Sequence, residues 1–155
     1  MRKKTKSLLE ELLCGSLALE AVAVLKGGAS ANIRVDDEEF SYEVTKRKGV
    51  IREKFLENAD FTVTLSHAAL SHLAEEANLP AADLATIAIE IVQGVLSKAP
   101  ERAIELRVHA GPFVLWQRGY LNLLILGGKP LMSFLASHGL AGVQEVLALL
   151  KKLRS

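Results

Sequence analysis

The sequence predicts an α+β fold: an antiparallel or mixed sheet of five to seven strands, with four or five helices packed mainly on one face. Between residues 31 and 65, apolar side chains alternate with polar ones, which is the period of a half-buried strand. Before and after this region the apolar spacing changes to three and four residues, which is the period of an amphipathic helix. Strands and helices are therefore grouped along the chain rather than strictly alternating.

The composition bounds the class of protein. A chain of 155 residues predicts one α+β domain over residues 1–155, with residues 1–6 as a basic tail. The net charge of +1 gives no overall attraction to nucleic acid, so we expect no nucleic-acid partner. The single cysteine, Cys14, excludes an internal disulfide and suits a reducing cytoplasm, which is the location we expect.

The first half of the chain divides into a helix, a meander and a second helix. Residues 7–26 carry leucines at helical spacing and are followed by two glycines, which predicts one helix. Residues 31–65 contain short alternating runs separated by turn signals, which predicts antiparallel strands. Ser66 follows the last run, and its hydroxyl can accept a hydrogen bond from a free amide of the next helix, which we expect to continue to about residue 77.

The following segment, residues 80–98, predicts a helix with an unusually wide apolar surface. Proline is tolerated in a first helical turn, so we expect this helix to begin at Pro80. Its polar residues fall on one narrow stripe: Asp83, Thr86, Glu90, Gln93 and Ser97. Apolar residues cover the remainder, so the helix should contact more than one neighbour.

The last third predicts three strands and two helices. Alternation predicts a strand over residues 104–108. Residues 113–116 and 121–126 are expected to form two further strands, the second covered on both faces because nearly all of its positions are apolar. The remaining segments expected to be helical are 131–137 and 140–153.

A search for catalytic and metal-binding patterns gives no candidate. His67 and His72 are five residues apart, whereas metal-binding pairs on a helix use spacings of three or four. No Gly-x-Ser-x-Gly motif is present, and the segment at residues 127–130 lacks the residues of a phosphate-binding loop. We therefore expect no catalytic residue, no metal and no cofactor, and we expect that the protein is not an enzyme.

The segment "ADFTVTLSHAALSHLAEE" resembles a short motif of the sterol-carrier-protein family, in which a strand runs into a helix with two leucines three residues apart. The matching residues are Ala59, Asp60, Thr62, Thr64, Leu65, Ser66, Leu70 and Leu73. This resemblance implies a sterol-carrier-protein-like fold with an apolar tunnel between sheet and helices, and a lipid-binding function.

The wide apolar helix and this resemblance together predict non-catalytic binding of a lipid or other apolar small molecule. The residues expected to line the cavity are Ile87, Ile91, Trp116, Phe134 and Leu147. The alternative is a protein-interaction module or homodimer that buries the surplus apolar helix surface. A weak peripheral contact with a membrane, through the basic start and the first helix, is a further expectation.

Overall fold

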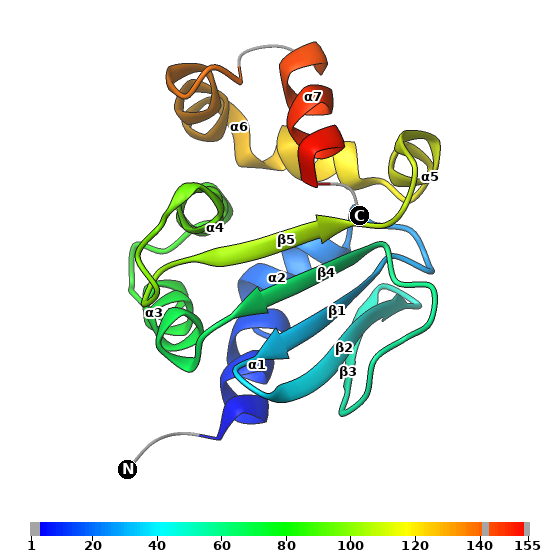
Figure 1. Ribbon diagram of the computed structural model, residues 1–155, viewed down its shortest axis with the longest axis vertical. Helices are drawn as coiled ribbons and strands as arrows, with labels where there is room; N and C mark the ends of the chain where they lie inside the picture. The colour runs from blue at the N-terminus through cyan, green and yellow to red at the C-terminus, as the bar shows by residue number, and fades with distance from the viewer. Residues whose placement is uncertain (1–3, 141–142, 154–155) are drawn as a thin grey trace.

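The computed structural model describes residues 4–140 and 143–153. Five strands form one mixed sheet, and the described residues contain seven helical segments (Figure 1). The elements, in chain order, are α1 (Thr5–Leu13), α2 (Ser16–Val22), β1 (Ser30–Val35), β2 (Glu38–Thr45), β3 (Lys48–Arg52), β4 (Phe61–Leu65), α3 (His67–Ala77), α4 (Leu84–Leu96), β5 (Ile104–Val108), α5 (Pro112–Gln117), α6 (Tyr120–Ser137) and α7 (Val143–Leu153).

The sheet has the strand order β3-β2-β1-β4-β5. Strands β1, β2 and β3 pair antiparallel, as the meander predicts, whereas β4 returns parallel to β1 and β5 pairs antiparallel with β4. The parallel return is possible because residues 53–60 cross from β3 to the far side of β1. The Asn32 side chain holds this crossing by two hydrogen bonds to the backbone of Leu56, at 2.8 and 2.7 Å. The predicted α+β class with a mixed sheet is confirmed.

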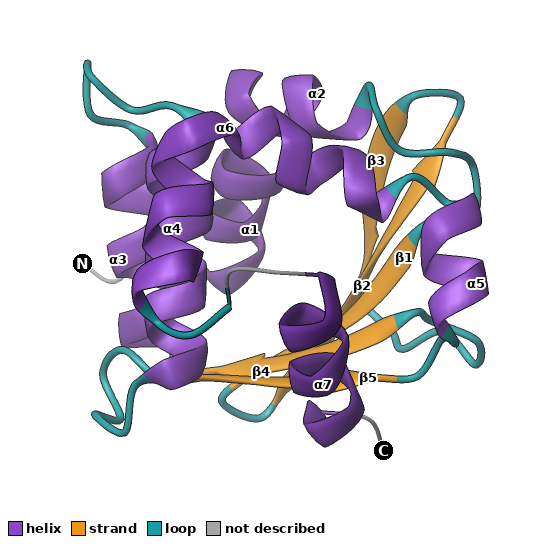
Figure 2. Cartoon of the chain, turned by 90° about the horizontal axis from the view of Figure 1, so that it is seen from above, coloured by secondary structure: helices purple, strands orange, loops and turns teal. Residues whose placement is uncertain are grey.

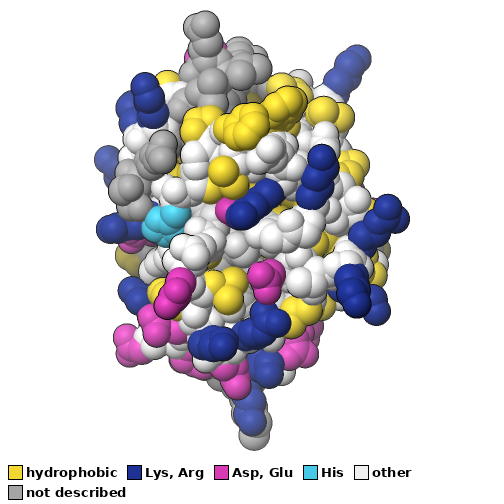
Figure 3. Space-filling view, turned by 90° about the vertical axis from the view of Figure 1, so that its right-hand side faces the viewer, with side chains coloured by type: hydrophobic (Ala, Val, Ile, Leu, Met, Phe, Trp, Pro, Cys, Tyr) yellow, Lys and Arg dark blue, Asp and Glu magenta, His cyan; other side chains and the backbone are white. Residues whose placement is uncertain are grey.

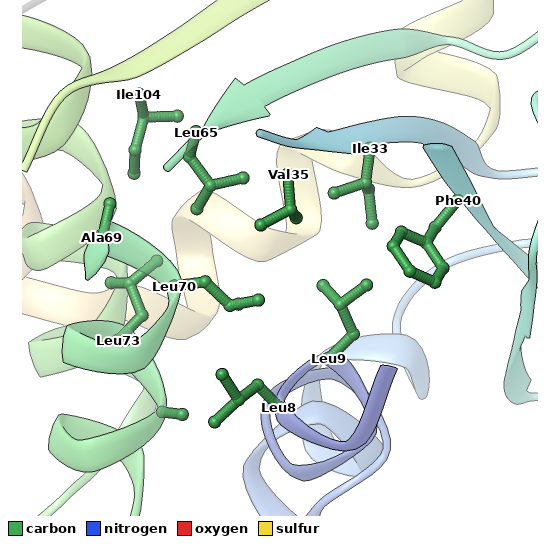
Figure 4. Packing of buried hydrophobic residues seen from close by; sticks show 11 residues of the cluster. Leu8, Leu9, Ile33, Val35, Phe40, Leu65, Ala69, Leu70, Leu73 and Ile104 are labelled. Carbon is green, nitrogen blue, oxygen red and sulfur yellow. The ribbon is translucent and has the colours of Figure 1, made fainter. Parts of the chain in front are cut away.

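The hydrophobic core lies between the sheet and helices α1 and α3. Side chains from β1, β2, β4 and β5 point toward leucines of these two helices (Figure 4). Leu8 and Leu9 of α1 are both almost fully buried, as is Leu70 of α3. Helices α4 and α7 instead pack along the edge strand β5. The N-cap predicted for α3 is confirmed, because the Ala69 amide donates to Ser66 Oγ at 3.1 Å.

The segment predicted as one helix over residues 7–26 is two helices. Helix α1 ends at Leu13, and α2 begins at Ser16 after an extended Gly15. A side chain at this glycine would place its Cβ 2.7 Å from the Glu11 carbonyl oxygen. Glycine, which has no Cβ, permits this close approach of the two backbones. The helix can therefore end here and a second helix can begin in a different direction.

Helix α4 begins later than expected. The predicted start at Pro80 is wrong, because Asp83 is the N-cap and the first helical residue is Leu84. The Asp83 carboxylate accepts hydrogen bonds from the Thr86 amide at 2.8 Å and from the Thr86 hydroxyl at 2.7 Å. These bonds, the backbone one foremost, hold the pKa of Asp83 below its usual value.

The two strands predicted at residues 113–116 and 121–126 are helices, so that prediction is wrong. Pro112 occupies the first turn of α5, where its missing N–H costs no hydrogen bond. Gly128 has a non-helical conformation (φ 62°, ψ −160°) that divides α6 into two helical parts, and the second part agrees with the separate helix expected at 131–137. Because the two expected strands are helical and the first expected helix is divided, the described residues contain more helices than the four or five predicted.

Candidate ligand-binding cavity

An apolar cavity of about 300 Å³ lies among α1, α2, α4 and α6. These helices lie around the same central region when the molecule is seen from above (Figure 2). The residues that line the cavity are Leu12, Leu13, Leu17, Ala18, Ala21, Val22, Leu25, Tyr42, Ala77, Leu84, Ile87, Ala88, Ile91, Leu123, Leu126 and Gly127. Its volume is at the lower end of the range of about 300–1,000 Å³ usual for small-molecule sites.

Helix α4 supplies one wall of the cavity. Its lining residues, Leu84, Ile87, Ala88 and Ile91, follow the spacing i, i+3, i+4, i+7 and therefore share one face. Ile87 is buried, whereas Ile91 is 39% exposed. The face therefore runs from the interior toward an opening. The rest of the wide apolar arc of α4 packs against α3, α6 and β5, which explains why the helix has so few polar positions.

The opposite wall comes from the helix pair at the N-terminus. Leu12 and Leu13 end α1, and Leu17 and Ala21 belong to α2. The break at Gly15 allows the two short helices to present these side chains from different directions. Leu8 and Leu9, one turn earlier in α1, are buried in the core instead. The first turns of α1 thus pack in the core, and its last residues line the cavity.

Helix α6 closes the third side at its kink. Leu123, Leu126 and Gly127 line the cavity just before the irregular Gly128. A Cβ on Gly127 would lie 2.2 Å from Leu131 Cδ2, so only glycine lets the following turn fold back this closely. The part of α6 that lines the cavity therefore ends at the kink.

Among the described residues of this lining, Tyr42 is the one with a polar side chain. Its hydroxyl donates a hydrogen bond to the Leu13 carbonyl oxygen at 2.9 Å, and burial raises the pKa of Tyr42 to about 12. The ring lies over Gly49 of the neighbouring strand, where a Cβ would be 2.0 Å from the hydroxyl oxygen. The tyrosine is therefore neutral and its donor is occupied, which leaves the cavity an apolar surface.

A shallower groove adjoins the cavity at the surface. Leu84, Leu126 and Gly127 line both hollows, so the two are neighbours. The groove adds the carboxylates of Glu20 and Asp83, which are both exposed. A molecule in the apolar interior would therefore meet polar, acidic groups where it reaches solvent.

A buried ion pair fastens the strands to the α5–α6 junction. The side chain of Asp60 is only 2% exposed and accepts hydrogen bonds from the Arg118 guanidinium and, at 2.6 Å, from the Tyr120 hydroxyl. The Ser30 amide also donates to this carboxylate, at 3.3 Å. Burial, followed by the hydrogen bond to Asp60, raises the pKa of Tyr120 above its usual value. This network holds α6 in place beside the sheet.

A second polar cluster joins α3 to α4. His72 Nε2 lies 3.1 Å from Glu90 Oε2, and Arg102 Nη1 lies 3.8 Å from the same oxygen. Glu90 faces away from the apolar cavity, on the polar stripe of α4. The cluster connects α3 with α4. Among the described residues, no group of three or more His, Cys, Asp or Glu is arranged to hold a metal ion.

Two of the five residues expected to line the cavity do so in the structure. Ile87 and Ile91 both line it. Trp116 lies on α5 and is 61% exposed, and Phe134 lies on α6 with its ring 4.3 Å from that of His138; neither lines the cavity. Leu147 belongs to α7, but its side chain lies outside the described part of the structure. Leu84 and Ala88 share the helical face of the two isoleucines, so the same spacing could have identified them.

Fold and site together define an α+β domain with a partly open apolar cavity between helices. No protein-family model matches the chain, and no curated protein sequence matches it. One similar solved structure is described as "UbiJ-SCP2 Ubiquinone synthesis protein": it is 14% identical, the alignment covers 78% of this chain and 90% of that chain, and the TM-score is 0.41. At this similarity neither a family nor a function can be transferred, so the function rests on the cavity.

Proposed function

We propose that the protein binds a lipid or other apolar small molecule in the cavity among α1, α2, α4 and α6, without catalysing a reaction on it. The observation that carries the proposal is the lining: of its residues only Tyr42 has a polar side chain, and that hydroxyl already donates to Leu13. Apolar walls around unfilled volume lose contacts that an apolar ligand would restore. The resemblance of residues 59–76 to the sterol-carrier-protein family favours the same class of ligand.

Occupancy of the cavity can be tested with 1-dodecanol as the probe, because its neutral hydroxyl is not repelled by the carboxylates of Glu20 and Asp83 in the adjoining groove. We expect native mass spectrometry to detect one bound molecule, and we expect an excess of about 100 times the dissociation constant to raise the melting temperature by about 5 °C or more. Ala88 lines the cavity, so Ala88→Phe should fill it and abolish both effects. The matched control is Ala68→Phe, which adds the same ring to an exposed position of α3 and should bind as the wild type does. Equal binding by both variants would contradict the proposal.

The alternative function, a protein-interaction module or homodimer, draws on apolar side chains left exposed on the helices. Leu19, Leu79 and Leu96 are each more than two-fifths exposed. Light scattering over a dilution series tests the homodimer, because a monomer at every concentration rules out self-association but not interaction with a different protein.

The single cysteine supports the cytoplasm as the proposed location. Among the described residues, no helix is long and apolar enough to cross a membrane.

A further inference from the structure

Helices α5 and α6 expose large apolar side chains on the outside of the molecule. Ile125 is 74% exposed, and Phe113 and Trp116 are 62% and 61% exposed. Leu121, also exposed, lies one helical turn before Ile125 and therefore shares its face. We call these four residues the α5–α6 apolar surface. It lies outside the cavity, which is lined by other residues of α6.

The two aromatic side chains of this surface lie together on α5. Their ring centroids are 6.0 Å apart on α5, and both rings remain open to solvent. Leu115, between them in sequence, is buried and anchors the helix. The exposed pair therefore lies on a helix that is anchored to the rest of the molecule, and not on a loop.

The segment that carries this surface has charged side chains of one sign only. Residues 106–144 contain no Asp or Glu, although the whole chain has 18. Lys129 follows Ile125 on α6, and the Lys26 amide donates to the Arg118 carbonyl oxygen at 2.9 Å, which places this lysine beside the α5–α6 junction. Arg118 pairs with Asp60, so Lys26 and Lys129 supply the positive charge at this junction. The exposed carboxylates of Glu20 and Asp83 lie in the groove beside Leu126, which none of the four residues of the surface lines.

The same separation is visible on the molecular surface. Figure 3 faces the side on which α5 lies: hydrophobic side chains gather in its upper half with Lys and Arg side chains around them, whereas Asp and Glu side chains lie mainly in its lower half. Exposed aromatic and aliphatic side chains surrounded by cations match a bilayer with anionic headgroups, into which tryptophan inserts at the level of the headgroups.

We propose that the α5–α6 apolar surface docks on a lipid bilayer that carries anionic headgroups. This differs from the expected contact through the first helix, because Leu8 and Leu9 of α1 are used in the core. The proposal goes beyond ligand binding and does not depend on it, since docking requires only an outer surface. Apolar insertion and attraction to anionic lipid should contribute together, so binding should weaken as salt is added.

The experiment uses Trp116, the single tryptophan of the chain, as its own probe. Vesicles of phosphatidylcholine with phosphatidylglycerol should shift the emission of Trp116 to shorter wavelength, and lipids brominated on their acyl chains should quench it. Vesicles of phosphatidylcholine alone should bind at least about tenfold more weakly. Unchanged emission with both kinds of vesicle would overturn the proposal. So would an equal shift without vesicles on raising the protein concentration, because the surface would then be a contact between two copies.

A matched pair of variants assigns the binding to this surface. Phe113→Ser keeps the tryptophan probe and should weaken vesicle binding by about tenfold, because it removes one inserting ring. Leu79→Ser removes a similarly exposed side chain between α3 and α4, and should bind as the wild type does. Equal vesicle affinity of the two variants would overturn the assignment. Circular dichroism checks folding, and if Phe113→Ser fails to fold, Ile125→Ser takes its place.

Discussion

Asp60 shows how one side chain can hold distant segments of this chain together. Its carboxylate accepts from Arg118 and Tyr120, which lie 58 and 60 residues further along the chain, and from the Ser30 amide. Its own amide donates to the Ser30 carbonyl oxygen at 3.1 Å. The start of β1, the start of β4 and the junction of α5 with α6 therefore meet at one buried charge.

The first prediction is that Asp60→Asn lowers the free energy of unfolding by about 3 kcal/mol, because it leaves Arg118 without its buried partner. We choose the lower end of the usual range since the Arg118 side chain is 32% exposed and can be partly solvated. Urea denaturation measures the loss. Tyr120→Phe keeps the ion pair and removes the two hydrogen bonds of the hydroxyl, one to Asp60 and one from the Ser30 amide, so it should cost about 1–2 kcal/mol. Equal losses in the two variants would show that the ion pair is not the stabilising contact.

At the scale of elements, Gly94 sets how closely α4 approaches the sheet. A Cβ at this position would lie 2.6 Å from Ile104 Cδ1 and 2.9 Å from the Arg102 carbonyl oxygen. The isoleucine methyl can move, but the backbone oxygen at the start of β5 moves only with its segment. The glycine is therefore needed for packing, although it is a poor helix former.

The second prediction is that Gly94→Ala destabilises the protein by about 1–2 kcal/mol, even though alanine favours a helix by about 1 kcal/mol. The clash forces α4 away from β5, and thermal unfolding reports the change. Gln93→Ala, at the exposed neighbouring position, places the same residue on the same helix without a clash. It should leave the melting temperature nearly unchanged. A more stable Gly94→Ala variant would refute this account of the packing.

The elements also show which predictions local sequence can support. The Ser66 cap depends on a hydrogen bond to a residue three positions away, so the pattern identified it. Residues 121–126 are apolar at nearly every position, and such a run fits a covered strand as well as a buried helix. Pro112 was a signal for a helix start that the apolar run after it, residues 113–116, obscured. Contacts such as Asp60 with Arg118 leave no local pattern at all.

At the scale of the whole molecule, the cavity results from helices that each serve two neighbours. Helix α1 packs its first turns in the core and its last leucines in the cavity, and α4 faces both β5 and the cavity. The sequence indicated the contribution of α4 through Ile87 and Ile91. It could not indicate that α1, α2 and α6 complete the enclosure, because that depends on the break at Gly15 and the kink at Gly128.

The measurement that tests the central claim most directly is methyl NMR of the isoleucine side chains during a titration with 1-dodecanol. Ile87 and Ile91 line the cavity, whereas Ile125 lies on the outer surface of α6. We predict saturable shifts at Ile87 and Ile91, with Ile125 unchanged. Shifts confined to Ile125, or no shift at any of the three, would contradict binding inside the cavity.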